Sequence, residues 1–353
     1  MRSIRSVSKS LSLGLAALAS LVVAGAAQAA PAPLVDHHMH IFSPEAARVL
    51  KIICERVGPQ KCPPEISKDS STGAEVVTAL DADGIHRGVL LSTAYFFGSP
   101  ELTDLHLDIA REMRAENQFV VDQAHSQCKR LTAFISVNPL LPNALDEIRY
   151  WSRVGGVGGL KLHLSNSNFD FRSPEEVKKL AAVFQAAQLG HMAIVVHFQT
   201  QRKDFGAEDV AIFLRDVAPE ARTIPIQIAH AAGGGGVEKT ELDAITAFAD
   251  AFEAHPAATH NIFFDLAMVP DELSNTAKIA AAPTDVAALK VQMRRIGLHR
   301  FVLGSDWTSG LDLKHYFDDE RATLALSDED WAALAANTAP YLKTAGAGCP
   351  GRL

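Results

Sequence analysis

The stretch that decides how this chain is interpreted is Leu-Val-Asp-His-His-Met-His, residues 34–40. Its apolar start is typical of a short buried strand. Alternate residues of a strand point to the same side, so His38 and His40 present two imidazoles to one point, and Asp36 shares that face. Two neutral imidazoles at the end of a strand suit a divalent metal such as zinc. Because a single His-x-His pattern often arises by chance, the rest of the chain has to support this interpretation.

Eight apolar, β-rich runs alternate with amphipathic segments along the chain. The runs are nearly continuous in apolar residues, which is typical of parallel strands covered on both faces. Eight βα units in one array predict an α/β fold, a single-domain (β/α)8 TIM barrel over residues 30–353. The alternative, an open doubly wound sheet, usually has fewer strands and an early dinucleotide-binding motif. The predicted strands are Leu34–His38, Gly88–Ala94, Leu131–Asn138, Gly159–Leu164, Met192–Phe198, Pro225–Ala231, Asn261–Ala267 and Arg300–Asp306.

Helix signals between these runs agree with a barrel. Ser173 is a predicted N-cap, Pro174 takes the first helical position, and Glu176 is expected to close a capping box. The helix that follows ends at Gly190, a residue typical of helix C-termini. Further helices are predicted over Glu241–Glu253, over Asp285–Ile296 and after Ser327.

Three more polar residues end predicted strands. His197 ends strand 5, His230 ends strand 6 and Asp306 ends strand 8. Catalytic groups of such barrels stand at the C-terminal ends of the strands, so these side chains and the pair on strand 1 are expected at one mouth. Three imidazoles and a carboxylate would hold a catalytic zinc with a water molecule, whose pKa the metal lowers towards neutrality. Each residue alone is more often a packing residue, but five at the ends of four strands favour a site.

Four motifs together carry a resemblance to a known family. They are Asp36-x-His38-x-His40, Val196-His197, Ala229-His230-Ala231-Ala232-Gly233-Gly234 and Gly304-Ser305-Asp306-Trp307. In this order they resemble the amidohydrolase superfamily, and within it the amidohydrolase-2 branch of metal-dependent TIM-barrel hydrolases and aminocarboxymuconate-semialdehyde-type decarboxylases. The resemblance runs from Asp36 to the tail at residues 337–340.

The resemblance implies a role for each of these residues. His38, His40, His197 and Asp306 would ligate one divalent metal, most simply Zn2+, and His230 would act as the acid and base beside the bound water. Metal-activated water would then attack an ester, lactone or amide carbonyl of a small molecule, with Asp306 or His230 moving the proton. A non-oxidative decarboxylase of a small unsaturated or aromatic carboxylic acid is the alternative. A non-catalytic exported binding protein is a second alternative, against which the separate His230 counts.

Four residues near the predicted mouth are candidates for substrate binding. Lys161 and His163 share one face of strand 4, where binuclear superfamily members carry a carboxylated lysine. Because amidohydrolase-2 relatives are commonly mononuclear, we expect these two residues to contact substrate or to support a ligand. Arg202 and Trp307 lie just past strands 5 and 8 and are further candidates, although an exposed arginine is usually only solvated.

The N-terminus carries the features of a signal peptide. Arg2, Arg5 and Lys9 precede an Ala/Leu-rich segment, and Ala27-Gln28-Ala29 is a cleavage site, so residues 1–29 are expected to be removed on export to the periplasm or medium. An uncleaved membrane anchor is the alternative. Losing three basic residues takes the net charge from −8 to −11. Such an acidic chain has no electrostatic reason to bind nucleic acid or anionic membranes, so we expect a small-molecule substrate. The sequence leaves the oligomeric state open, a homo-oligomer included.

Export also permits disulfides, and the chain has four cysteines. Cys54 and Cys62 lie in the segment Ile41–Thr72, which is predicted to be a long loop on the catalytic face. Four cysteines allow three connectivities. We favour a local Cys54–Cys62 bridge that staples this loop as a lid, with Cys128–Cys349 tying the C-terminal tail to the body.

Overall fold

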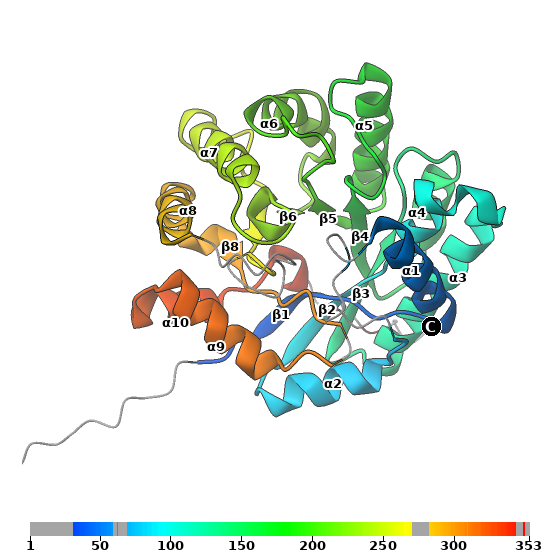
Figure 1. The fold of residues 1–353 in the computed structure, drawn as a ribbon, viewed down its shortest axis with the longest axis horizontal. Helices are drawn as coiled ribbons and strands as arrows, with labels where there is room; N and C mark the ends of the chain where they lie inside the picture. The colour runs from blue at the N-terminus through cyan, green and yellow to red at the C-terminus, as the bar shows by residue number, and fades with distance from the viewer. Residues whose placement is uncertain are drawn as a thin grey trace, which may run out of the picture. The chain divides into compact units, whose positions relative to one another are not determined.

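The computed structural model describes residues 31–58, 62, 69–269, 282–308, 310–343 and 349. Residues 31–353 form one compact unit, and the predicted signal peptide lies outside the described residues. Eight parallel strands pair in chain order with helices arranged around them, as Figure 1 shows. The Met39–Trp307 bridge and the hydrogen bond from His37 N to Leu303 O join the last segment to the first strand. The predicted (β/α)8 barrel is confirmed.

All eight predicted strands are present, although their ends differ. The strands are β1 Val35–Met39, β2 Arg87–Leu91, β3 Leu131–Ser136, β4 Val157–His163, β5 Ala193–His197, β6 Ile226–Ile228, β7 Ile262–Asp265 and β8 Phe301–Val302. The helices are α1 Pro44–Val57, α2 Gly73–Ala82, α3 Ile109–Ser126, α4 Ala144–Trp151, α5 Pro174–Leu189, α6 Ala207–Ile212, α7 Lys239–Ala254, α8 Pro283–Ile296, α9 Leu313–Leu324 and α10 Asp328–Ala336. Among the described residues, none of the helices combines the length and apolar character that a membrane span needs.

Most predicted strands run past their observed ends, and two of these differences bear on the candidate site. β6 ends at Ile228, and His230 lies in the short 3-10 turn η5, Ala229–Ala232, with a left-handed φ of 54°. β8 ends at Val302, and Asp306 follows with a φ of 56°. A continuous apolar run gives no signal for where strand pairing stops, so the boundaries could not be read from composition.

The segment between residues 41 and 72, predicted to be a loop, contains the helix α1 among its described residues. Ser43 caps α1 by accepting a hydrogen bond from Ala46 N, and Pro44 takes the first position. This is the same start signal that predicts α5, where Ser173 Oγ accepts from Glu176 N. The Glu176 carboxylate instead accepts from Asp170 N, so the predicted capping box does not form at α5. Helix α1 therefore occupies residues 44–57 of the segment predicted to be a loop.

Both favoured disulfides are confirmed. Cys54 and Cys62 are joined with their Cα atoms 5.2 Å apart, at the C-terminal end of α1. Cys128 and Cys349 are joined with their Cα atoms 4.6 Å apart, across 221 residues of sequence. The second bridge ties the C-terminal tail to the chain just after α3.

The barrel interior is filled partly by the C-terminal end of the chain. Residues 339–342, which we call the C-terminal plug, contain the 3-10 turn η8, Pro340–Leu342. Val35 and Ala193, which begin β1 and β5, belong to the same buried cluster as the plug, so the plug enters from the N-terminal end of the barrel. The cluster comprises Val35, Val89, Leu91, Phe134, Ala193, Val195, Ala229, Phe263, Val302, Ala339, Tyr341 and Leu342.

Candidate metal centre

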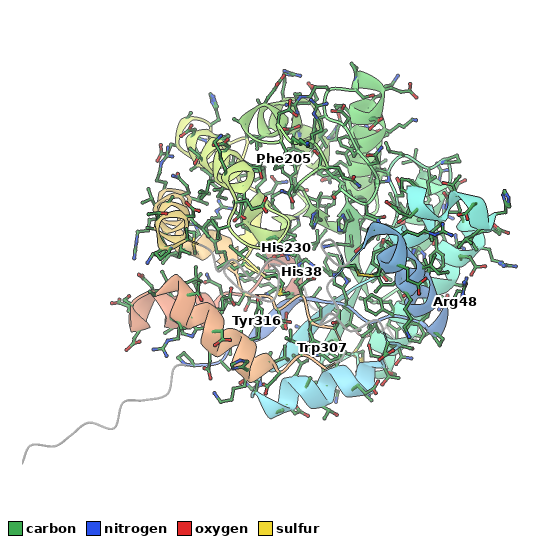
Figure 2. The ribbon with its side chains drawn as sticks, in the orientation of Figure 1. His38, Arg48, Phe205, His230, Trp307 and Tyr316 are labelled. Carbon is green, nitrogen blue, oxygen red and sulfur yellow. A yellow bond between two sulfur atoms is a disulfide. The ribbon has the colours of Figure 1, made fainter. Side chains whose placement is uncertain are left out.

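Three side chains converge at the mouth of the barrel, two from the first strand and its end and one from the segment after the last strand. His38 Nε2 lies 3.2 Å from His40 Nε2, and both nitrogens lie 3.1–3.2 Å from Asp306 Oδ1. Two ligand atoms about 2.1 Å from an ion in tetrahedral geometry would be roughly 3.4 Å apart. Two imidazole nitrogens and a carboxylate oxygen at this spacing fit a divalent cation. His38 is among the residues at the centre of the ring of helices in Figure 2.

The far nitrogen of each imidazole in this group is occupied by the barrel. His38 Nδ1 donates to Asp265 Oδ2 at 3.1 Å, and His40 Nδ1 donates to Leu91 O at 2.7 Å. A proton on Nδ1 leaves the lone pair on Nε2, which is the tautomer that a metal ligand needs. Burial and the nearby Lys161 lower the pKa of His38 to about 3, so this imidazole is neutral at pH 7.

His230 belongs to the same group. The nearest ligand atoms of His38, His230 and Asp306 all lie within 4.8 Å of one another. His230 Nδ1 donates to Ala267 O at 2.7 Å, so its Nε2 is also left with a lone pair. Its left-handed backbone is held by a hydrogen bond from His230 N to Asp265 Oδ1 at 2.9 Å.

Asp265 is the site residue that sequence reasoning missed. It ends β7 and is fully buried. Burial opposes its ionisation, but His38 and the other donors hold the pKa of Asp265 well below its usual range. A signal was available, because Asp265 is the one charged residue within the predicted apolar strand Asn261–Ala267. The four groups that donate to it are His38 Nδ1, Gln227 Nε2, His230 N and Ala267 N.

Asp306 supplies the negative charge at the open side of the group. Its side chain is 30% exposed, whereas that of His38 is fully buried. Partial burial opposes ionisation, but the facing His38 and His40 hold the pKa of Asp306 well below its usual range. The carboxylate is therefore ionised and available to a cation at neutral pH.

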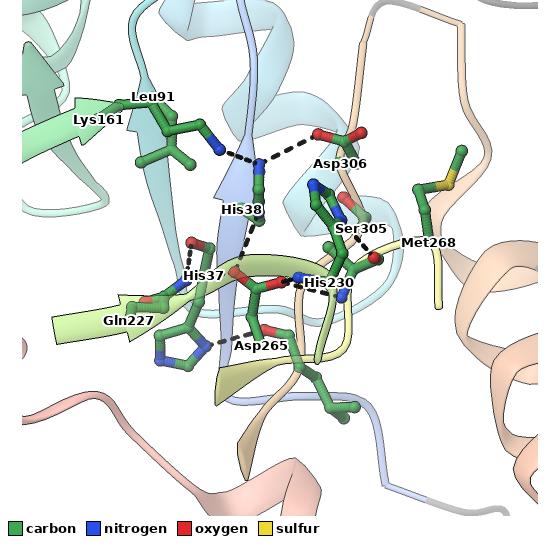
Figure 3. A network of polar contacts seen from close by, with 12 residues as sticks. His37, His38, Leu91, Lys161, Gln227, His230, Asp265, Met268, Ser305 and Asp306 are labelled. Atoms are coloured by element: carbon green, nitrogen blue, oxygen red, sulfur yellow. Dashed lines mark hydrogen bonds and ion pairs between the residues drawn. The ribbon is translucent and has the colours of Figure 1, made fainter. Parts of the chain in front are cut away.

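Lys161 brings a cation to the same nitrogen. Its Nζ lies 3.0 Å from His38 Nε2, and Figure 3 shows Lys161 and Asp306 converging on that atom from opposite sides. Burial lowers the pKa of Lys161 to about 8, against the pull of Asp306 and Asp265. A lysine with this pKa carries its charge at pH 7, at the wall of the candidate metal site.

His197 and His163 form a stacked pair on the neighbouring strands. They are paired in the register of β4 and β5, and their ring centroids lie 3.8 Å apart at an interplanar angle of 15°. His163 Nδ1 accepts from Asn166 N at 3.1 Å, and the His197 ring contacts the His230 ring edge-on with centroids 5.0 Å apart. Burial lowers the pKa of both well below the usual value, so both are neutral. His197 thus joins the group through ring contacts to His230.

The other three candidates are held by structural contacts. Asp36 accepts from Ser305 N and Oγ at 3.0 and 2.5 Å, which fastens β1 to the segment after β8. Trp307 is buried, and its indole nitrogen donates to Leu311 O at 3.0 Å. Arg202 binds both oxygens of Asp204 at 2.9 Å and also pairs with Asp170. The guanidinium of Arg202 is therefore engaged by carboxylates of the chain itself.

Comparison with known proteins gives a likeness of fold. Neither a protein-family model nor a curated protein sequence matches the chain. A zinc-bound amidohydrolase from Burkholderia multivorans has a TM-score of 0.54 at 14% identity, over 90% of this chain and 95% of that one. A manganese-bound 5-carboxyvanillate decarboxylase from Novosphingobium aromaticivorans has a TM-score of 0.56 at 14% identity, over 88% and 95%. The same enzyme from Sphingomonas paucimobilis has a TM-score of 0.54 at 14% identity, over 86% and 96%.

These solved structures belong to the amidohydrolase-2 group, which is also the group that the sequence motifs of this chain resemble. The resemblance in motifs and the likeness in structure therefore point to the same group. At 14% identity the likeness establishes the shared barrel fold. The chemistry of this chain therefore has to be argued from its own side chains.

Proposed function

We propose that this protein is a metal-dependent hydrolase that cleaves an ester, lactone or amide bond of a small molecule. The observation that carries the proposal is the convergence of His38 Nε2, His40 Nε2 and Asp306 Oδ1 within 3.2 Å, with the far nitrogen of each imidazole engaged by the barrel. An amidohydrolase of the same fold has zinc bound and a 5-carboxyvanillate decarboxylase has manganese bound, which supports a divalent ion here.

In this proposal His38, His40 and Asp306 hold one ion, with His197 as the further ligand expected from the family resemblance. Zn2+ is the ion we favour for two imidazoles and a carboxylate. When bound, such an ion makes a water molecule acidic enough to act as a nucleophile near neutral pH and polarises the substrate carbonyl.

His230 moves the proton in this scheme. Its Nδ1 hydrogen is engaged by Ala267 O, so only Nε2 can accept a proton from the attacking water and return it to the leaving group. The left-handed turn that carries His230 aims the ring into the mouth and is held by Asp265. The stacked His163 has its Nδ1 occupied and keeps Nε2–H to donate to a substrate oxygen.

Lys161 favours a second candidate, a non-oxidative decarboxylase of a small aromatic or unsaturated acid. A buried ammonium group 3.0 Å from a metal-ligand nitrogen is suited to a substrate carboxylate. Arg202 is less suited to this task because Asp204 and Asp170 already bind it. The same cation would serve a hydrolase whose substrate carries a carboxylate beside its scissile bond.

The decisive experiment reconstitutes metal-stripped protein with zinc or manganese and assays two substrate panels. Neutral esters and lactones report hydrolysis, and aromatic carboxylic acids report release of carbon dioxide. We expect metal-dependent hydrolysis, and His230→Asn should lower kcat by about 10²–10⁴-fold while the bound metal is retained. Carbon dioxide release without hydrolysis would establish the second candidate. A wild-type protein that binds no metal would overturn the proposal.

We also propose that the mature protein works outside the cytoplasm after cleavage of residues 1–29. Two disulfides in one chain are typical of an oxidising compartment, which supports export. The acidic net charge supports a small-molecule substrate rather than nucleic acid or a membrane surface. Mass spectrometry of the exported protein checks this, because an N-terminus at residue 30 is expected.

A further inference from the structure

The C-terminal plug reaches the candidate metal centre through a chain of buried hydrogen bonds. The Tyr341 hydroxyl donates to Gln227 Oε1 at 2.8 Å, and Gln227 Nε2 donates to Asp265 Oδ2 at 2.6 Å. The same carboxylate oxygen accepts from His38 Nδ1 at 3.1 Å. Every member of this chain is buried. Figure 3 shows the part of it near the candidate site, with Gln227 to one side of Asp265 and His38 above it.

The donors and acceptors along this series of hydrogen bonds can be assigned in only one way. Gln227 Nε2 faces two acceptors, Asp265 Oδ2 and His37 O, the latter at 3.4 Å, so the amide must turn its NH2 group towards them. Its oxygen then faces Tyr341, whose hydroxyl can only donate. An ionised Asp265 in turn requires the hydrogen of His38 on Nδ1. The phenol at one end is thus consistent with a lone pair on Nε2 at the other.

The plug makes a second contact with the same strand. Ala339 N donates to His37 Nε2 at 3.1 Å, and His37 Nδ1 donates to Leu303 O at 2.9 Å. His37 is the residue next to His38 in β1. The tail beyond the plug is fastened by the Cys128–Cys349 disulfide, and Asn337 before it donates to two carbonyls, those of Leu298 and Phe301. The plug is therefore anchored on both sides of Tyr341.

We propose that Tyr341 is a positioning residue for the metal centre, acting through Gln227 and Asp265 to orient His38 and keep its Nε2 available. This inference rests on the proposed function, since it gives His38 the role of a metal ligand. Without the hydroxyl, Gln227 Oε1 is left unpaired in the barrel interior, and the amide no longer has a donor that holds it in place. The hydrogen bond from Gln227 then no longer fixes the position of the Asp265 carboxylate, and so the orientation of the His38 ring is less well defined.

Tyr341→Phe tests the proposal, with Phe134→Leu as the matched control. Phe134 packs against the Tyr341 ring with centroids 4.9 Å apart but has no part in the hydrogen-bond chain. Two measurements are made on the purified protein. The first is the low-field proton signal of His38 Nδ1–H in metal-stripped protein, assigned by its loss in His38→Asn. The second is zinc affinity, by competition with a chromophoric chelator.

We expect Tyr341→Phe to shift or broaden the His38 signal and to weaken zinc binding by roughly threefold to tenfold, less than is typical when the direct partner of a ligand is removed. Phe134→Leu should lower the melting temperature while leaving the signal and the affinity unchanged. If Tyr341→Phe does not fold, Gln227→Met breaks the same chain and carries the same expectation.

Two results would overturn the inference. One is a His38 signal and zinc affinity in Tyr341→Phe equal to those of wild type. The other is a loss of affinity that follows the loss of stability equally in both variants, which would make the plug a packing element only. A shifted His38 signal in a protein that binds no metal would support the positioning role of Tyr341 while the proposed function failed.

Discussion

Two buried carboxylates in this barrel have opposite chemistry. Asp265 ends β7 below the mouth, and Glu116 lies on α3 beside the segment that follows β1. Asp265 accepts four hydrogen bonds, one of them from the imidazole of His38. Glu116 Oε1 accepts one from Ser43 N at 3.3 Å, and Oε2 has no hydrogen-bond partner among the described residues.

The facing imidazole of His38, rather than the depth of burial, sets Asp265 apart from Glu116. Burial raises the pKa of Glu116 from 4.5 to about 7, and its hydrogen bond to Ser43 offsets only part of this effect. The donors around Asp265 outweigh the same penalty. A buried carboxylate that faces a candidate ligand imidazole therefore keeps a low pKa, whereas Glu116, which faces no imidazole in its described contacts, has a raised one.

Removing the charge at Asp265 should have the largest effect. Asp265→Asn places an amide hydrogen against the hydrogens of His38 or Gln227 and strips a negative charge from four donors. We expect a loss of about 3–5 kcal/mol in the free energy of unfolding, as is typical when one partner of a buried charged network is removed. Metal affinity should fall by about 10–100-fold. Urea unfolding and metal content per chain measure the two effects.

Glu116→Gln is the matched control for that experiment. It also replaces a buried carboxylate by its amide, but on a different helix and away from the described contacts of the metal group. Its metal content should equal that of wild type. Equal loss of metal in both variants would mean that general destabilisation, rather than the donors around Asp265, controls binding.

The raised pKa of Glu116 predicts a dependence of stability on pH. The folded pKa is about 7 and the ordinary value is 4.5, so between these values the folded state holds a proton that the unfolded state releases. Stability contributed by this group should fall as pH rises from about 4.5 to 7, by up to about 3 kcal/mol. Glu116→Gln removes the titration, so its stability relative to wild type should grow across this window. A constant difference between the two proteins would contradict the prediction.

The barrel and part of the site could be predicted from the sequence because they depend on local patterns. Apolar runs located all eight strands, and a polar residue after each run pointed to His38, His40 and Asp306, which the structure brings together. Asp265 was missed because it lies two residues before the end of its predicted strand, whereas the observed β7 ends at this residue. The left-handed turn at His230 could not be predicted, since hydrogen bonds to residues about 35 positions away hold it.

The engagement of Arg202 shows a second limit of sequence reasoning. Asp204 is only two residues from Arg202, so this ion pair could have been predicted from the sequence. Asp170, the second partner, comes from the segment after β4. Nothing in the sequence pattern brings that carboxylate to Arg202. A cation near a predicted mouth can be named from sequence, but whether it is free for a substrate depends on long-range partners.

Lys161 extends the comparison to a buried cation and should give the smallest effect. Its pKa of about 8 leaves it charged at pH 7, yet its nearest described partner is the imidazole of His38, 3.0 Å away, rather than a carboxylate. A charge held in this way is available to a substrate carboxylate. Lys161→Met should therefore raise KM for a carboxylate-bearing substrate by about tenfold, as expected from one lost charge-assisted hydrogen bond. Turnover of a neutral ester should change little.

Metal content of the same variant separates the two roles that Lys161 can have. If the lysine binds substrate, wild type and Lys161→Met each hold about one metal per chain, and only KM changes. If wild type holds about two and the variant loses one, Lys161 is a metal-bridging residue and the site is binuclear. Lys161 would then support metal binding, as Asp265 does, rather than substrate binding. The substrate carboxylate would need another partner at the mouth.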